Sequence, residues 1–259
     1  YKIIFGEPQK PSISDVSKLS NDDLVAAVFH ENEWFSRHAR RVLQERAASG
    51  MDLNLTHKTL LHAFETRREI PQKLRAMWAL GVSGGATKEW LGNQLNHPNE
   101  HVRTWAVRFL SEGNPPASRL AELARNEASS LVRLAIASAL QRLPVDQRAD
   151  VASGLLSHKK DADDHNLPLM IWYGLTPLGD TNPMELVKLA EASEMPRVNR
   201  LIARRLSENI EKHPEALDAL VQVAARKSDA FRTDIVQGIT EGLRGWRSAP
   251  VPKHWSQLR

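Results

Sequence analysis

The sequence predicts an all-α fold, a right-handed α-α superhelix built from about seven helix pairs. Two stretches thirty residues apart, 102–110 and 132–140, supply the first observation. Each places apolar residues at i, i+3, i+4, i+7 and i+8, the spacing that lines one face of an α-helix. Each also has an arginine directly after its first apolar residue, Arg103 and Arg133. A pattern that returns at this distance is typical of stacked helical repeats.

The second observation is that one register fits the whole chain. Seven successive segments carry leucine or isoleucine at the i+8 position, and alanine or isoleucine at the i+4 position. Repeats spaced by 30 to 37 residues place their extra length in loops. The i+8 residues are Leu43, Leu80, Leu110, Leu140, Leu175, Leu206 and Ile239, and the i+4 residues are Ala39, Ala76, Ala106, Ile136, Ile171, Ile202 and Ile235.

Capping residues and periodicity justify the helices in order. Ser20, Thr56 and Thr87 are expected N-caps, and Pro71 and Pro116 fit a first helical turn, where the missing N–H costs nothing. Beside the central repeats, helices are expected over 22–29, 34–46, a segment capped by Thr56, 71–80, 88–95, 145–156, 167–178, 183–192, 198–207, 215–225 and 231–243.

Three regions follow from this pattern. Residues 1–18 are a lead-in whose run Tyr1–Phe5 is β-like, and this run is either the last strand of a preceding β domain or a disordered tail. Residues 19–247 hold the helical repeats, and residues 248–259 form a C-terminal tail or linker.

Composition restricts the chemistry. The absence of cysteine excludes disulfides, thiolate metal sites and covalent c-type haem within these residues. No apolar run approaches the ~18 residues of a membrane helix. The net charge of +4 is an ordinary surface balance. We therefore expect no catalytic residues, no cofactor and no metal site in this chain.

A family resemblance follows from the central repeats. A turn followed by Val-Arg-x-x-Ala-x-x-x-Leu, as at 102–110, resembles HEAT repeats, which implies an interaction scaffold. Val132-Arg133 fits this pattern, whereas Val198-Asn199 and Leu167-Pro168 depart from it.

A narrower resemblance rests on residues 32–41, 74–80 and 164–174. These segments resemble the HEAT region of large exported planctomycete-type proteins, described as membrane-bound dehydrogenases or c-type haem-binding proteins. The resemblance implies a β-propeller before this region and a cytochrome c module with Cys-x-x-Cys-His after it. It also implies a periplasmic or cell-envelope location, and a non-catalytic scaffold that contacts these flanking domains or another protein.

The alternative is a HEAT-like DNA glycosylase acting on alkylated purines. That chemistry resembles a tryptophan pair and a carboxylate on a basic groove. Trp105 has no aspartate one turn later, which argues against the enzyme and against nucleic acid as the partner. Trp105 is instead expected in the core, and Trp78 and Trp172 at the seams between repeats.

Basic residues recur on the second helices. They define a predicted concave basic stripe for an anionic partner. The competing interpretation is a solvated face balanced by acids, including Arg–Asp pairs that bridge repeats. The stripe comprises Arg37, Arg40, Arg41, Lys73, Arg75, Arg103 and Arg133, with Arg108 beside them.

The loop 158–166 is the most unusual local feature. Its two histidines and three aspartates match no EF-hand spacing. It leads into an apolar stretch with more aromatic residues than its own stripe needs. We expect a contact with a partner or a flanking domain at Asp163, Asp164, His165, Trp172 and Tyr173. The alternative is a surface loop that caps the next helix, with both aromatics packed between repeats.

Two charges interrupt the apolar stripes near the C-terminus, Arg205 and Asp234. A buried charge needs a partner. The register therefore predicts that these residues pair with each other or with another nearby charge.

Overall fold

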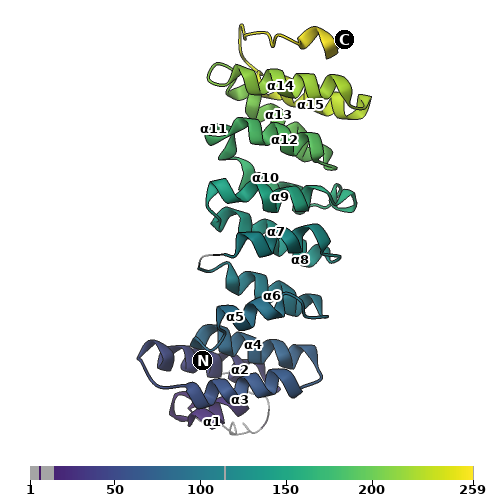
Figure 1. Ribbon diagram of the computed structural model, residues 1–259. Helices are drawn as coiled ribbons and strands as arrows, with labels where there is room; N and C mark the ends of the chain where they lie inside the picture. The colour runs from purple at the N-terminus through teal and green to yellow at the C-terminus, as the bar shows by residue number, and fades with distance from the viewer. Residues whose placement is uncertain (1–5, 7–14, 114, 259) are drawn as a thin grey trace. The chain divides into compact units, whose positions relative to one another are not determined.

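The computed structural model describes Gly6, residues 15–113 and residues 115–258. Within these residues it contains α-helices and short 3-10 helices and no strand, which confirms the all-α prediction. The β-like run Tyr1–Phe5 lies outside the described residues. The chain divides into two compact units, unit 1 (Tyr1–Val102) and unit 2 (Arg103–Arg259), and the helices of each can be followed in Figure 1.

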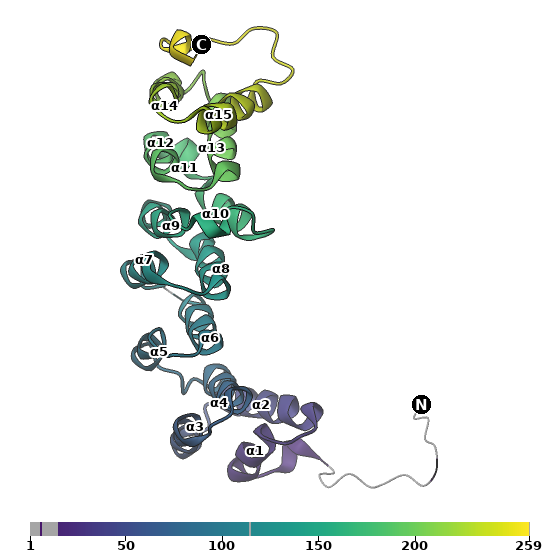
Figure 2. The same cartoon turned by 90° about the vertical axis from the view of Figure 1, so that its right-hand side faces the viewer.

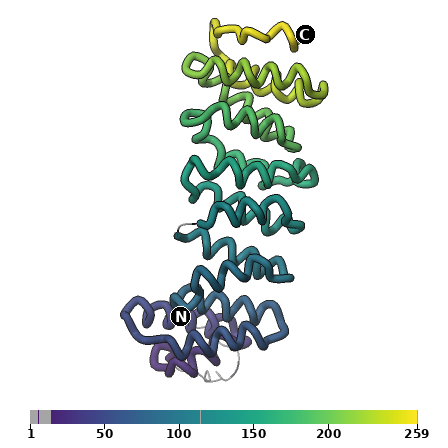
Figure 3. The backbone as a smooth tube through the Cα atoms, in the orientation of Figure 1, coloured from purple at the N-terminus to yellow at the C-terminus, as the bar shows by residue number. Residues whose placement is uncertain are grey.

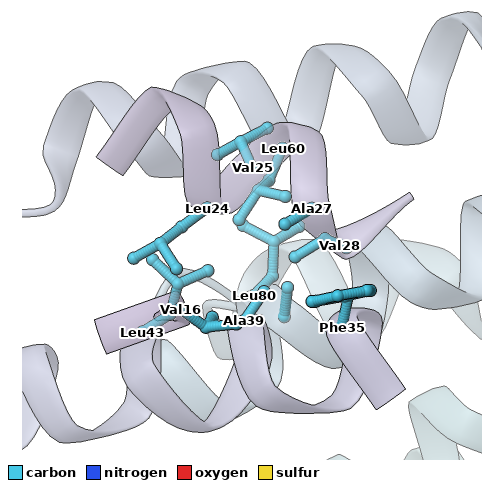
Figure 4. Close-up of a cluster of buried hydrophobic side chains, with 11 residues drawn as sticks. Val16, Leu24, Val25, Ala27, Val28, Phe35, Ala39, Leu43, Leu60 and Leu80 are labelled. Atoms are coloured by element: carbon cyan, nitrogen blue, oxygen red, sulfur yellow. The ribbon is translucent and has the colours of Figure 1, made fainter. Parts of the chain in front are cut away.

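Unit 1 begins with a 3-10 helix and continues with paired helices. Part of its core is a hydrophobic cluster built from the 3-10 helix and the first four α-helices. Figure 4 shows Leu24, Ala39 and Leu80 converging there from different helices, and all three are fully buried. The elements are η1 (Val16–Lys18), α1 (Asn21–Val28), α2 (Glu33–Ala48), α3 (Asn54–Thr66), α4 (Ile70–Ser83) and α5 (Lys88–Gln94).

The helix ends of unit 1 confirm two predicted caps and correct a third. Ser20 and Thr87 accept hydrogen bonds from the backbone of Asp23 and Trp90. Thr56 is not a cap, because α3 begins two residues earlier and buries Thr56 in its first turn. The helix α4 ends at Gly84, whose φ of 83° is the left-handed conformation that glycine adopts without strain.

Unit 2 consists of two layers of helices. Figure 2 shows α7, α9, α12 and α14 in one layer and α8, α10, α13 and α15 in the other, and the tube of Figure 3 shows the pairs stacked in chain order. We call the second layer, together with α6, the second helices of unit 2. The elements are α6 (Glu100–Leu110, in unit 2 from Arg103), α7 (Ala117–Asn126), α8 (Ser130–Ala139), η2 (Leu140–Arg142), η3 (Val145–Gln147), α9 (Arg148–Leu156), η4 (Lys159–Asp161), α10 (Leu167–Leu175), α11 (Leu178–Thr181), α12 (Pro183–Ala192), α13 (Pro196–Glu208), α14 (Pro214–Arg226), α15 (Asp229–Gly242) and η5 (Trp255–Leu258).

The predicted register is confirmed by burial. All fourteen i+4 and i+8 residues are at most 5% exposed. The single helix expected over 167–178 is wrong, because it is divided into α10 and α11. Pro177 has no N–H to continue the helical hydrogen bonds at this point.

Two glycines bring α13 and α15 into close contact. A Cβ atom on Gly238 would lie 2.2 Å from the carbonyl oxygen of Arg200, and one on Gly242 would lie 2.5 Å from that of Arg204. The opposite surface carries the small side chains of Ala203 and Ser207. Small residues at this spacing therefore fix the distance between the last two second helices.

The two charges near the C-terminus have different outcomes. Arg205 pairs with Asp180 at 2.5 Å, as predicted, and crosses Gly179, where a Cβ atom would meet its side chain. Asp234 forms no ion pair with any described residue, and its neighbour Arg200 is bound to Glu241 at 2.9 Å. The half-buried Asp234 carboxyl has a raised pKa, caused by burial and partly opposed by the charge of Arg200.

The described part of the C-terminal tail packs on α14. Asp218 accepts a hydrogen bond from the backbone N–H of His254 at 2.9 Å, and its other carboxylate oxygen lies 2.7 Å from His254 Nδ1. Among the helices of residues 15–113 and 115–258, none has the length and apolar character that a membrane span requires.

Candidate interaction surface on the second helices

Arg133 and Arg103 of the predicted stripe are bound inside unit 2. Arg133 is completely buried, and its Nε and Nη2 donate to the two carboxylate oxygens of Asp161, both at 2.5 Å. Its Nη1 donates to the carbonyl oxygen of Glu127 at 2.7 Å. Arg103 makes a bidentate pair with the buried Glu127 carboxylate at 2.8 and 2.7 Å. Arg133 is therefore removed from any solvent-exposed stripe, and Asp161 from the exposed loop.

The Glu127 carboxyl shows how strongly these charges interact. Burial alone would raise its pKa, but hydrogen bonds from Arg103 and from the Ser129 N–H outweigh that effect. The positive charges of Arg103 and Arg133 add to them, so its pKa lies below the ordinary value of 4.5. These side chains link the turns of successive repeats, which is the structural role that sequence reasoning left open for them.

In unit 1 most of the stripe is also engaged. Arg75 binds Glu33 and the carbonyl oxygen of His30, and Lys73 donates to the carbonyl oxygen of Phe64 at 2.5 Å. Ser36, in the register position of Lys73 and Arg133, donates to the carbonyl oxygen of Val28 at 2.7 Å. This position thus repeatedly supplies a donor to carbonyl oxygens in the last turn of the preceding helix or just beyond it, where the helix itself provides no partner.

The exposed residues of the stripe lie on α2. Arg37 and Arg41 form ion pairs with Glu33 at 3.5 Å and Glu45 at 2.8 Å. Arg40 instead places its guanidinium carbon 5.0 Å from the centre of the Trp78 ring.

A groove opens across the second helices of unit 2. It has a volume of about 500 Å³. Its apolar part comes from α6, α8 and α10 through Trp105, Leu131, Leu134 and Met170. Trp105 is half-buried here, where the sequence predicted a core position, and Leu131 and Leu134 lie outside the inward stripe of α8. These two surplus leucines are the sequence signal that could have indicated the groove.

Charged side chains line the same groove. Arg108 lies with its guanidinium carbon 4.9 Å from the centre of the Trp105 ring. Arg142 donates to the carbonyl oxygen of Ser111 at 3.3 Å, and the single acidic residue is Glu112. The groove therefore combines apolar side chains with two arginines and one glutamate, a composition common at protein interfaces.

The helix α10 separates this groove from a second hollow. Met170 lines the groove, whereas Trp172 lines the second hollow with Leu201 and Arg204 of α13. Helix periodicity places Tyr173 between these two sides, and its side chain is 54% exposed. Trp172 is half-buried beside α13, as expected for a seam position, and neither predicted aromatic is fully buried.

The structure places the predicted acidic loop apart from these aromatics. Asp163, Asp164 and His165 are exposed and line a separate hollow with Pro196 and Arg197. Asp164 accepts hydrogen bonds from the backbone of Asn166 and Leu167, both at 2.8 Å, at the start of α10. These bonds, from Leu167 first, lower its pKa. Asp164 thus stabilises the helix start, whatever else it contacts.

The remaining chemistry is sparse. In the part of the chain that the structure describes, no group of three or more His, Asp, Glu or Cys could hold a metal ion. The groove contains Trp105 and the carboxylate of Glu112, but no second tryptophan lines it.

Comparison with known proteins identifies the central repeats. Residues 58–141 match a family model described as HEAT repeats. This range includes both copies of the Val-Arg pattern, so the resemblance drawn from those residues is confirmed for this region. A search of curated proteins finds no match to the chain.

Proposed function

We propose that this chain is a non-catalytic scaffold that binds a protein segment on the second helices of unit 2. The groove between α6, α8 and α10 carries the proposal, because it joins an apolar lining to a polar rim. Trp105 and Arg108 line it, with the guanidinium of Arg108 over the Trp105 ring, and tryptophan and arginine are among the residues most enriched among binding anchors. Tyr173, exposed on the ridge of α10, extends this surface toward α13.

The predicted contact at Asp163, Asp164 and His165 belongs to the same proposal. Their hollow includes Arg197 of α13, so a segment that crosses α10 and α13 could meet both the loop and the aromatic pair. The loop would contribute polar contacts at the rim, where water remains.

The origin of the binding segment is proposed from sequence resemblance. Residues 32–41, 74–80 and 164–174 support a place within an exported dehydrogenase–cytochrome c protein. The partner would then be a flanking propeller, the cytochrome module or a protein bound to them. The coding sequence on either side of this region tests the idea. If it encodes no propeller before this region and no Cys-x-x-Cys-His sequence after it, the proposed origin of the segment is wrong.

Site-specific photocrosslinking tests the docking surface. A photoreactive amino acid at position 173 of the full-length protein should crosslink to one defined segment. The matched position is Met184 on α12, which is 40% exposed in the other layer and should give no such product. Arg142→Glu, in the groove, should reduce the product at position 173. Equal products at both positions, or no effect of Arg142→Glu, would contradict docking at this face.

One observation favours the glycosylase alternative. Trp105, Arg108, Arg142 and Glu112 line one groove, which is the combination of an aromatic, basic residues and a carboxylate that base extrusion uses. Release of alkylated purines from duplex DNA by the purified protein, abolished by Glu112→Gln, would establish the enzyme and overturn the scaffold.

A further inference from the structure

Arg40 differs from the other arginines of the predicted stripe. Arg37, Arg41 and Arg75 each pair with a carboxylate, whereas Arg40 forms no ion pair with any residue that the structure describes. Its half-buried guanidinium lies over Trp78, across the contact between α2 and α4. A cation–π contact orients a guanidinium without neutralising its charge.

The charges around Arg40 do not balance. Glu33 is the nearby carboxylate, and it already binds Arg75 and Arg37. Burial lowers the pKa of Arg40, and the charges of Arg37 and Arg75 lower it further, while Glu33 opposes them. Three arginines thus share one carboxylate, and an additional anion would relieve the repulsion between them.

The geometry indicates which anion fits. A guanidinium presents a planar fork that matches a carboxylate. A phosphate dianion would bring more negative charge toward Glu33, whose repulsion favours a singly charged group.

We propose that Arg40 and Trp78 form a carboxylate-binding site that anchors an acidic side chain of a protein segment lying across α2 and α4. Charge complementarity identifies the occupant, since an acidic segment supplies the missing anion. This site lies in unit 1 and is independent of the docking surface in unit 2. Either can fail while the other stands.

A nuclear magnetic resonance titration tests the site with a defined probe. The probe is a twelve-residue peptide rich in glutamate, and its counterpart has glutamine at each glutamate. We expect the acidic peptide to shift the Arg40 Nε–H and Trp78 indole signals, and the neutral counterpart to leave them unchanged. Arg40→Gln should weaken binding about tenfold or more, because a charge-assisted bidentate pair is lost. Arg40→Lys should weaken it less, since the charge remains without the fork.

The matched control is Arg41→Gln, on the same helix, whose loss should change the affinity less than about twofold. Unchanged unfolding temperatures would show that each variant is folded. Equal weakening by Arg40→Gln and Arg41→Gln would reduce the effect to net charge and overturn the site. Tighter, Arg40-dependent binding of single-stranded DNA would also overturn it, since the occupant would then be a nucleic acid.

Discussion

Arg133 and Asp161 form a buried ion pair that joins α8 to the turn before α10. Both hydrogen bonds measure 2.5 Å, and the two side chains are 1% and 4% exposed. The third donor of Arg133 holds the carbonyl oxygen of Glu127, whose carboxylate binds Arg103. One polar network thus links successive repeats of unit 2 through their turns.

Removing only one member of this ion pair should destabilise the folded state strongly. Arg133→Met leaves the Asp161 carboxylate buried without its partner, and we expect a loss of about 3–5 kcal/mol in the free energy of unfolding. The double variant Arg133→Met/Asp161→Leu should regain most of that loss, because no unpaired charge remains. Urea unfolding followed by circular dichroism measures both. Arg41→Met, which breaks an exposed pair, is the control and should cost no more than about 1 kcal/mol.

Glu127 should make unit 2 sensitive to acid. Its folded-state pKa is lower than the ordinary value of 4.5, so it contributes stability above pH 4.5 that is lost as the pH falls through the folded pKa. Glu127→Gln should be less stable than the wild type near neutral pH, and the two should converge in acid. Unfolding midpoints of both proteins, measured from neutral pH to below pH 4.5, test this. A difference between the two midpoints that stays constant with pH would contradict the assignment.

The fold could be predicted from the sequence because burial is periodic. The i+4 and i+8 positions require only that one face of each second helix be apolar, and all of them are buried. The fate of Arg133 could not be predicted this way. Its partner Asp161 lies 28 residues away in a loop whose composition is typical of an exposed surface. Pairing across repeats depends on the three-dimensional path of that loop.

The groove could not be predicted from the sequence for a related reason. Trp105 occupies an inward position of the stripe, yet it is only half-buried and lines a hollow beside α8. The loop and Trp172 of the predicted contact are close in sequence but line different hollows. Periodicity predicts which side of a helix is buried, and it does not predict how widely neighbouring helices are spaced.

A side chain at position 238 should destabilise the packing of α15 against α13. A Cβ atom there would lie 2.2 Å from a backbone oxygen of α13, so Gly238→Ala must separate the two helices. We expect a loss of about 1–3 kcal/mol from this overpacking, although alanine favours a helix more than glycine does. Gly113→Ala, which meets open space, should have little effect. Thermal unfolding of the two variants decides, and equal stability would show that α13 and α15 can move apart freely.

Asp234 should destabilise the folded protein at neutral pH. Burial raises its folded-state pKa above the ordinary value of 3.8, so the folded state binds the proton more tightly than the unfolded state does. The protein therefore loses stability as the pH rises from 3.8 through the folded-state pKa. Asp234→Asn removes the charge, and its unfolding temperature near neutral pH should exceed that of the wild type. Well below pH 3.8 the two proteins should unfold together. A variant that is less stable at both pH values would mean that Asp234 has a stabilising partner.

Variants of Asp164 and His165 should distinguish a structural role of the loop from a docking role. Asp164→Ala removes the acceptor for the Asn166 and Leu167 N–H groups, and we expect it to cost about 0.5–2 kcal/mol, as the loss of a helix cap does. His165→Ala removes an exposed side chain and should change stability by less than about 0.5 kcal/mol. If the loop contacts the segment bound at Tyr173, His165→Ala should still lower the crosslink at that position. A crosslink that falls only with Asp164→Ala, in step with its stability, would limit the loop to its structural role.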